Sequence, residues 1–342
     1  MKHIVFKRPG GYDQVSIQES PDLHPSQGQV VVNVKAAGVG YGDCIIRMGL
    51  YKSAKLHGYP ITPGFEFAGT VAEVGADVTG FTVGQPVFGV SLFNGCATQV
   101  CIPAHQLFAM SKELTAVQAA AFPASFITAW YAVVKLGQAT KGMTALVHSA
   151  AGGVGMALVQ ILKTNGCAVI GVVGSPKKID AARSNGCDHV IDKSTEPLWP
   201  TVEKYAPKGF DLVFDSNGVS TMKEGYRHLK LTGRLVSYGF ASMLPKSGRL
   251  NFVALAIKFF KSPRFNPIRM AEGNKSVMAF NLSFLFERKD LLSESMAALM
   301  ELLHNGSIKP LPVTEYAFTD YEKALRDIES GKTVGKLVLV IP

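Results

Sequence analysis

The chain divides into two parts that differ in their pattern of apolar and polar residues. Up to about residue 124, short runs rich in β-branched residues are separated by Gly, Pro and Asp, for example at 30–36, 69–74 and 85–90. Short strands at such spacing are typical of β-sandwiches and barrels. We therefore predict a barrel-like β domain in this part, with its first strand within the segment from Met1 to Arg8.

From about Ser125 onward, apolar strands alternate with segments of helical length. The predicted strands are 144–148, 168–173, 189–191, 212–214 and 234–238, and the first two predicted helices are 154–165 and 177–185. Apolar strands that alternate with helices indicate right-handed βαβ crossovers and a parallel, doubly wound sheet. The predicted fold class is therefore α/β.

The C-terminal part returns to a different pattern. Amphipathic helices are predicted at 291–305 and 321–330, each followed by Gly, and the chain closes with a β-type run at 336–341. Because this run is a late strand, we expect it to join the N-terminal β domain. Residues 1–124 and 270–342 should then form one domain, and residues 125–269 the other, with a basic, apolar insertion at 244–275.

A glycine-rich turn between the strand at 144–148 and the helix at 154–165 indicates a ligand site. Glycines let the backbone approach a pyrophosphate closely, and a helix N-terminus offers free N–H groups and a positive dipole end. The alternative is a tight turn with a purely structural purpose. Since a strand precedes the turn, a helix follows it and a second strand lies at the right distance, we predict dinucleotide binding by Ala151, Gly152, Gly153, Val154 and Gly155.

The residues after the second strand indicate which coenzyme binds. An NAD site has Asp or Glu about 20 residues after the glycines, to accept hydrogen bonds from the ribose 2′-OH. This chain has Gly174, Ser175, Pro176, Lys177 and Lys178 there. Ammonium groups attract a 2′-phosphate, so we predict a preference for NADPH over NADH. The alternative is that these lysines are only the solvated start of a helix.

Composition narrows the class of protein. The 342 residues contain no run of about 18 apolar residues, the length that a membrane-spanning helix requires. The N-terminus has neither the apolar region nor the cleavage site of a signal peptide. Five cysteines are scattered without C-x-x-C spacing, which is typical of free thiols in a reducing compartment. We therefore expect a cytoplasmic protein.

The net charge of +9 is unevenly distributed. Residues 246–275 contain seven Lys or Arg and one acid, so this segment alone supplies +6. The rest of the chain is nearly balanced, which argues against a general nucleic-acid binder.

Several motifs together resemble one enzyme family, the medium-chain dehydrogenase/reductase superfamily and its zinc-free quinone oxidoreductase branch. They are the segments 36–43, 47–51, 63–71, 150–155 and 215–218. Within this branch, residues 225–229, 236–242 and 251–256 are similar to the synaptic vesicle membrane protein VAT-1 group. The resemblance implies a GroES-like catalytic domain formed from both chain ends, a Rossmann domain, and a homodimer paired through the edges of the Rossmann sheets.

The same resemblance bears on metal binding. Zinc-dependent members place a Cys and a His in the active site, and here those positions are Gly40 and Phe65. The four closely spaced cysteines of a structural zinc lobe are also missing. Without a thiolate or an imidazole ligand, a catalytic zinc ion would have no ordinary site, so we expect no metal. Quinone reductases of this type usually have Asn where this chain has Gly40, so a polar side chain near the substrate is lost.

The resemblance also implies roles for residues outside the turn. Thr128 corresponds to a threonine near the nicotinamide, and Ser175 and Lys178 correspond to residues that bind the adenosine phosphate. Lys193 stands where the family often has Tyr. Strand ends that face the coenzyme would contribute the remaining positions, which are Gly174, Asn217, Gly239, Phe240, Ser242, Phe280, Asn281 and Leu282.

These features predict an NADPH-dependent reductase that transfers hydride to a quinone or an α,β-unsaturated carbonyl without a metal. Such substrates spread the developing oxyanion charge by conjugation. Tyr41 and Tyr51 are candidate proton donors, and Asp43 is a candidate orienting residue. Each tyrosine could equally be a wall residue. Asp43 could be structural and paired with Arg47.

Two other functions remain open at this stage. The segment 244–275, which is apolar with interspersed Lys at 252–261, could lie on a membrane surface, in a regulatory protein that retains NADPH binding only as a vestige. The same segment could instead be a lid or a dimer-packing insertion. An enoyl thioester reductase would share the fold and the coenzyme, but it needs a pocket for a long acyl carrier that the sequence does not reveal.

Overall fold

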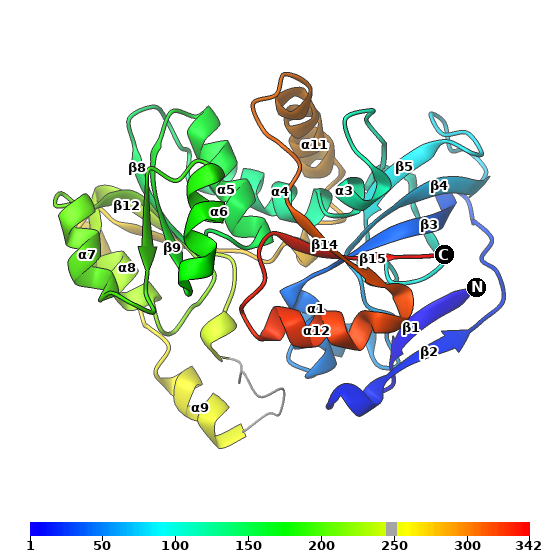
Figure 1. Ribbon diagram of the computed structural model, residues 1–342, viewed down its shortest axis with the longest axis horizontal. Coiled ribbons are helices and arrows are strands. Elements are labelled where there is room, and N and C mark those ends of the chain that lie inside the picture. Colours follow the sequence, from blue (N-terminus) through cyan, green and yellow to red (C-terminus); the bar gives the residue numbers. More distant parts are fainter. Residues whose placement is uncertain (244–251) are drawn as a thin grey trace. The chain divides into compact units, whose positions relative to one another are not determined.

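The computed structural model describes residues 1–243 and 252–342, which form two compact units (Figure 1). The first unit contains both ends of the chain and consists of Met1–Ile127, Leu282–Asn305 and Pro310–Pro342. The second unit consists of Thr128–Asn281 and Gly306–Lys309.

The first unit is built on β-strands. Their bounds are β1 (Lys2–Phe6), β2 (Val15–Glu19), β3 (Gln29–Val39), β4 (Glu66–Val74), β5 (Pro86–Val90), β6 (Gln99–Pro103), β7 (Leu107–Ala109), β14 (Val313–Ala317) and β15 (Lys336–Val340). The main sheet has the order β14-β15-β3-β4-β5-β7, and β6 pairs with β3. Alternate residues of β3, such as Val30, Val32 and Val34, are at most 2% exposed and form the core.

The final strand joins this N-terminal sheet, as the sequence predicted. β15 pairs antiparallel with β3, with Leu337 opposite Val39 and Val340 opposite Ala36. Lys336, at the start of β15, forms an ion pair with Glu66 of β4, and both side chains are almost fully buried. The second carboxylate oxygen of Glu66 accepts the backbone N–H of Ala124 at 2.8 Å.

The second unit contains a parallel sheet, and the predicted α/β doubly wound fold is confirmed. Its strands are β8 (Thr144–His148), β9 (Ala168–Val173), β10 (His189–Asp192), β11 (Phe210–Asp215), β12 (Leu229–Ser237) and β13 (Ser276–Ala279). Their order, β10-β9-β8-β11-β12-β13, reverses direction between β8 and β11. Such a switch point is where ligands bind in this class of sheet.

Helices cover both faces of this parallel sheet (Figure 1). The helices of the second unit are α5 (Gly153–Thr164), α6 (Ile179–Ser184), α7 (Leu198–Tyr205), α8 (Met222–Arg227), α9 (Phe252–Phe260) and α10 (Pro267–Glu272). Those of the first unit are α1 (Tyr41–Arg47), α2 (Lys52–His57), α3 (Ala116–Ala120), α11 (Lys289–His304) and α12 (Tyr321–Glu329), while α4 (Pro123–Trp130) spans the division.

The division between the units differs from the one that the sequence suggested. We expected residues 270–342 to belong with the β domain, but the structure assigns the segment up to Asn281 to the second unit. The reason is strand pairing, because β13 pairs in parallel with residues 234–237 of β12. This short strand carries too weak an alternation of apolar residues to be recognised in the sequence.

The expected insertion at 244–275 is described only in part, because residues 244–251 lie outside the described residues. Its remainder contains α9 and α10. Most of α9 is exposed in spite of its apolar sequence, with Val253 71%, Phe259 66% and Phe260 72% exposed. Among the described residues, none of the helices has the length and apolar character needed to cross a bilayer.

A buried charge network joins α1 to α12 in the first unit. Arg47 is fully buried and donates to Glu329 at 2.8 Å and to the carbonyl of Gly10 at 2.6 Å. Tyr12 donates its hydroxyl to Glu329 at 2.7 Å, and its ring lies 4.2 Å from the Arg47 guanidinium. The expected pair between Asp43 and Arg47 is therefore wrong, because Glu329 occupies the position beside the guanidinium.

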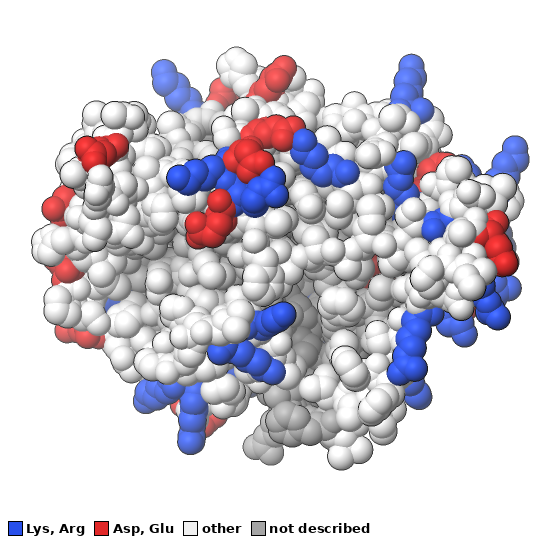
Figure 2. Space-filling view, turned by 180° about the vertical axis from the view of Figure 1, so that it is seen from behind, with Lys and Arg blue, Asp and Glu red and all other residues white. Residues whose placement is uncertain are grey.

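Charged side chains are dispersed over the face of the molecule drawn in Figure 2. Lys and Arg stand there in separate groups, with uncharged surface between them and acidic side chains close to several of them. This face therefore lacks the continuous basic strip that is typical of nucleic-acid binding.

Replacing Glu329 with Ala should destabilise the protein strongly, because Arg47 would remain buried without its carboxylate. We expect a loss of roughly 3–5 kcal/mol in the free energy of unfolding, measured by urea denaturation. The matched control is Glu322→Ala, which removes the partner of Arg326 in an exposed ion pair and should cost less than about 1 kcal/mol. Equal losses in the two variants would contradict the proposed importance of burial.

Candidate functional site

The predicted coenzyme residues of the second unit follow the carboxyl ends of neighbouring parallel strands. Going along the sheet in its spatial order, they are Lys193 after β10, then Gly174, Ser175 and Lys178 after β9, Ala151–Gly155 after β8, Asn217 after β11, Gly239, Phe240 and Ser242 after β12, and Phe280 and Asn281 after β13. Since carboxyl ends of parallel strands share one edge of the sheet, these residues form an elongated row along it.

The turn after β8 directs the start of α5 toward this edge. Gly152 caps the helix, and its backbone N–H bonds to the carbonyl of Ser149 at 2.9 Å. Ser149 itself has a φ of 56°, a backbone conformation that residues other than glycine rarely adopt. The first N–H groups of α5 have no partner within the helix, and together with the helix dipole they can bind an anion.

Close packing explains one glycine of the turn. A Cβ atom on Gly155 would lie 2.1 Å from the carbonyl oxygen of Ser149, so any side chain there would displace the turn. Gly171 of β9 is restricted in the same way, since its Cβ would lie 2.6 Å from the sulfur of Cys187 and 2.8 Å from Cβ of Ala150. Glycine at these two positions is therefore required by packing within the unit.

Two lysines meet at the β9–β10 end of the row. Burial of Lys178 lowers the pKa of its ammonium group, and the nearby ammonium of Lys193 lowers it further. The Lys193 stem also lies against the end of β9, because a Cβ on Gly174 would be 3.6 Å from its Cε. Two cations held this close repel each other, and an anion with two charges would relieve that repulsion. The pair therefore fits a phosphate monoester.

The loop after β11 is organised by a buried aspartate that sequence reasoning did not single out. Asp215 is fully buried and accepts the N–H groups of Asn217 and Gly218 at 2.7 Å each, and the hydroxyl of Thr221 at 2.6 Å. The signal in the sequence was the turn-forming run D-S-N-G directly after a strand. Among the described residues, the buried amide Nδ2 of Asn217 has no hydrogen-bond partner, so it can donate to a ligand.

The β12 and β13 end of the row combines backbone and aromatic groups. The N–H of Ser242 bonds to the carbonyl of Asn217 at 2.9 Å, which joins the loops after β11 and β12. Phe280 packs edge-on against Tyr131, with ring centroids 4.9 Å apart. Thr128, one helical turn before Tyr131, is also buried. Leu282 belongs to the first unit instead.

In the first unit, Asp43 is buried and bound to the backbone. Its two carboxylate oxygens accept the N–H groups of Gly40 at 2.8 Å and Gly64 at 3.2 Å. Burial raises its pKa to about 6, although these hydrogen bonds act in the opposite direction. Since the side chain is 0% exposed and both its oxygens accept backbone N–H groups, Asp43 links two loop segments.

Aromatic rings pack around Phe65, one of the two positions that the resemblance assigns to zinc ligands. The Phe65 ring lies 5.6 Å from that of Tyr51 and 5.9 Å from that of Phe93. A Cβ on Gly40 would have no neighbour closer than 3.9 Å, and its φ of −119° is open to any residue. Gly40 therefore leaves room and is not required by the backbone. Burial raises the pKa of Tyr41, so its hydroxyl stays protonated at neutral pH.

Among the described residues, no three His, Cys, Asp or Glu side chains are placed together so that they could hold a metal ion. All five cysteines are free, and burial is the main reason that the pKa of each thiol is raised. None of them has the lowered pKa of a reactive thiolate.

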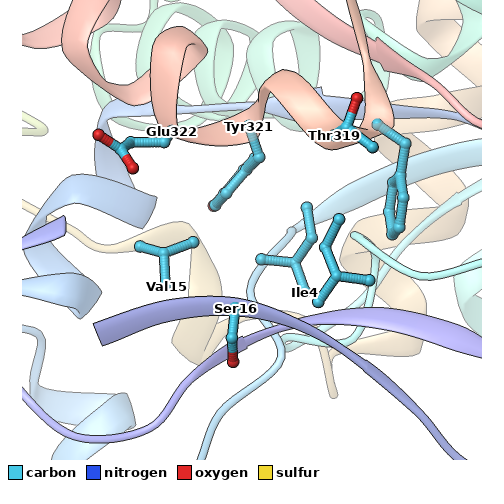
Figure 3. Close-up of a pocket in the computed structure, with 8 residues that line it drawn as sticks. Ile4, Val15, Ser16, Thr319, Tyr321 and Glu322 are labelled. Carbon is cyan, nitrogen blue, oxygen red and sulfur yellow. The ribbon is translucent and has the colours of Figure 1, made fainter. Parts of the chain in front are cut away.

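A pocket of about 210 Å³ in the first unit lies apart from all these residues (Figure 3). It is lined by the hairpin of β1 and β2 and by the start of α12. The ring of Tyr321 and the side chains of Ile4 and Val15 lie around the same space, whereas the hydroxyl of Ser16 points away from it (Figure 3). This pocket has both polar and apolar lining residues, and none of the predicted site residues is among them.

The raised pKa of Asp43 predicts a specific pH dependence of stability. The pKa is about 6 in the folded protein and near 3.9 in an unfolded chain. Its contribution to stability is therefore full below pH 4 and is lost as the pH rises through 6. The unfolding free energy of the wild type minus that of Asp43→Asn should be larger at pH 5 than at pH 7.5, by about 1 kcal/mol. A difference independent of pH, measured by urea denaturation, would refute this assignment.

Comparison with known proteins places the chain in a family. Residues 26–138 match the model of the alcohol dehydrogenase GroES-like domain, and residues 153–280 match that of the zinc-binding dehydrogenase. The synaptic vesicle membrane protein VAT-1 homolog of Rattus norvegicus is 34% identical over 99% of this chain and 84% of its own length. A probable quinone oxidoreductase of Leishmania amazonensis is 34% identical over 92% of this chain and 89% of its own.

The solved structures agree with these relatives. Escherichia coli quinone oxidoreductase, crystallised with NADPH, superimposes with a TM-score of 0.86 at 26% identity and covers 99% of this chain and 100% of its own. The GroES-like and Rossmann-type units expected from the sequence are thus both present. The chain belongs to the medium-chain dehydrogenase/reductase family, among the VAT-1 homologues and quinone oxidoreductases.

Proposed function

We propose that this protein is an NADPH-dependent reductase of quinones or α,β-unsaturated carbonyls that works without a metal ion. The observation that carries the proposal is the placement of two lysines, Lys178 and Lys193, after the neighbouring parallel strands β9 and β10. The end of β9 is where an NAD-specific site would have a carboxylate. A 2′-phosphate placed there would interact with two cations, which explains a preference for NADPH over NADH.

The rest of the row fits the other parts of the same coenzyme. The N-terminus of α5 would hold the pyrophosphate, and the free amide of Asn217 would donate to the groups beyond it. Thr128, Gly239, Phe240, Ser242, Phe280 and Asn281 would surround the nicotinamide end. When bound, NADPH supplies the hydride, and the protein orients the coenzyme and the substrate.

The first unit would supply the substrate side. Phe65 and Tyr51 offer an apolar wall, and the absence of a side chain at Gly40 leaves space beside it. The hydroxyls of Tyr41 and Tyr51 are the groups that we propose as hydrogen-bond donors to the substrate oxygen. Asp43 acts by positioning Gly40 and Gly64. A conjugated substrate needs no metal because it delocalises the charge that develops on its oxygen.

We further propose that the protein works as a cytoplasmic homodimer. β13 is at the edge of the parallel sheet, so one side of the strand offers backbone groups to another strand. Pairing of β13 with β13 of a second copy would continue the sheet. Free thiols are compatible with a reducing compartment.

Calorimetric titration with NADPH and NADH tests the coenzyme assignment. The wild type should bind NADPH at least tenfold more tightly than NADH, and it should oxidise NADPH in the presence of a small quinone. Lys178→Ala and Lys193→Ala should each weaken NADPH binding by roughly tenfold or more, because a charge-assisted hydrogen bond is lost, and should leave NADH binding unchanged.

Lys208→Ala is the matched control, since Lys208 is an exposed lysine just before β11, at the opposite end of the parallel strands, and its replacement should change neither affinity. If the wild type bound both coenzymes equally, or if the control lowered NADPH affinity as much as the other variants, the proposed phosphate site would be wrong.

A second candidate function, association with a membrane surface, is supported by α9. Val253, Ile257 and Phe260 are 50–72% exposed and lie one turn apart on this helix. Lys258 lies between them and donates to the carbonyl of Ser242 at 2.7 Å, which ties α9 to the loop after β12. An exposed apolar helix with nearby basic residues can insert shallowly into an anionic lipid surface.

Sedimentation with lipid vesicles tests this second function. The wild type should pellet with vesicles that contain phosphatidylserine and much less with neutral vesicles. Replacing Phe259 and Phe260 with Ser should abolish pelleting, because their apolar surface no longer enters the lipid. Leu231→Ser is the control, since Leu231 is an equally exposed apolar residue on β12, at 68%. If the wild type failed to pellet at low salt, α9 would have no role at membranes.

A further inference from the structure

A groove of about 570 Å³ runs along α11 on the first unit. It contains none of the residues assigned above to the coenzyme or the substrate. Its volume lies in the range of 300–1,000 Å³ that is typical of pockets for small molecules. The groove is lined on one side by α11 and on the other by β7 and the turn before β5.

One face of α11 shapes the groove. Lys289, Ser293, Ala297 and Met300 line it and follow one another at intervals of three or four residues, so they lie along one side of the helix. The distance from Lys289 to Met300 is about 16 Å at 1.5 Å of rise per residue. Ser293 and Ala297 are small and exposed, and their short side chains keep the groove open.

The groove is apolar along most of its length. Phe81 and Phe108 line it from the sheet side, and Met296 and Met300 from the helix. Phe81, Phe108 and Met300 are only partly buried, so apolar surface remains in contact with water. Methionine side chains are flexible and adapt to ligands of different shape. An elongated hydrocarbon chain would bury this surface.

The charge at one end of the groove is positive. Lys289 stands in the first turn of α11, and no carboxylate is among the described residues that line the groove. The neighbouring Arg288 is paired with Asp290 at 2.6 Å, whereas no ion pair of Lys289 is recorded in the described part of the chain. The ammonium group of Lys289 is therefore available to an anionic head group.

We propose that this groove binds a free medium-chain acyl carboxylate. The carboxylate pairs with Lys289, and the hydrocarbon tail extends past Ala297 to Met300. The proposal is independent of NADPH binding, because the groove lies within the first unit and shares no residue with the coenzyme row.

Isothermal titration with sodium decanoate, below the concentration at which it forms micelles, tests the proposal. The wild type should bind one decanoate saturably, and octanoate should bind about tenfold more weakly because two methylene groups are lost. Lys289→Ala should weaken decanoate binding several-fold but leave decanol binding unchanged. This separates the charge interaction from the apolar contact.

Ala297→Trp fills the groove and should reduce decanoate binding at least tenfold. Glu301→Trp, on an exposed part of α11 that does not line the groove, is the matched control and should bind like the wild type. Unfolding midpoints show whether each variant is folded.

Three results would overturn the proposal. The first is an absence of saturable binding to the wild type, and the second is an equal loss of binding in both tryptophan variants. The third is that Ala297→Trp binds decanoate like the wild type but differs from it in molecular mass in sedimentation analysis. In that case this face of α11 would be covered by a second copy of the chain in the wild type.

Discussion

The buried ion pair between Lys336 and Glu66 ties the last strand of the chain to the sheet formed by its first hundred residues. Both side chains are almost fully removed from water, so each charge is tolerated only because the other is present. Glu66 also accepts the N–H of Ala124, where α4 begins. The same contact therefore closes the first unit and fixes the start of the helix that leads into the second.

In the second unit, the parallel direction of the strands is the main constraint on where the site residues lie. All its strands run in parallel, so every loop that follows a strand emerges at the same edge. The glycine-rich turn, the two lysines and the loop held by Asp215 thereby lie in one row, although the chain from Ala151 to Thr221 separates the first from the last by 70 positions. Lys178 and Lys193 make one end of this row cationic, whereas the turn in its middle is closely packed around Gly155.

The first unit contains a cluster of aromatic rings around Phe65. The resemblance to the family assigns this position to a histidine ligand of the zinc-dependent members, and here the Phe65 ring packs against Tyr51 and Phe93. Asp43 keeps its place through two backbone N–H groups. The result is an apolar cluster beside a segment that two backbone hydrogen bonds hold in place.

The sequence by itself determined most of the secondary structure and the type of fold. Buried strands such as Thr144–His148 and Ala168–Val173 matched their predicted bounds, since continuous apolar runs between turn residues leave little alternative. The glycine-rich turn and the cationic residues after β9 were also readable, because their chemistry is local.

Only the tertiary structure decided which distant residues meet. Glu329, and not Asp43, neutralises Arg47, because α12 packs against α1 after nearly three hundred residues of intervening chain. The strand β13 was missed because pairing with β12 compensates for its weak apolar pattern. The role of Asp215 and the openness of the groove along α11 likewise depend on neighbours that are far apart in the sequence, and local patterns carry no information about such contacts.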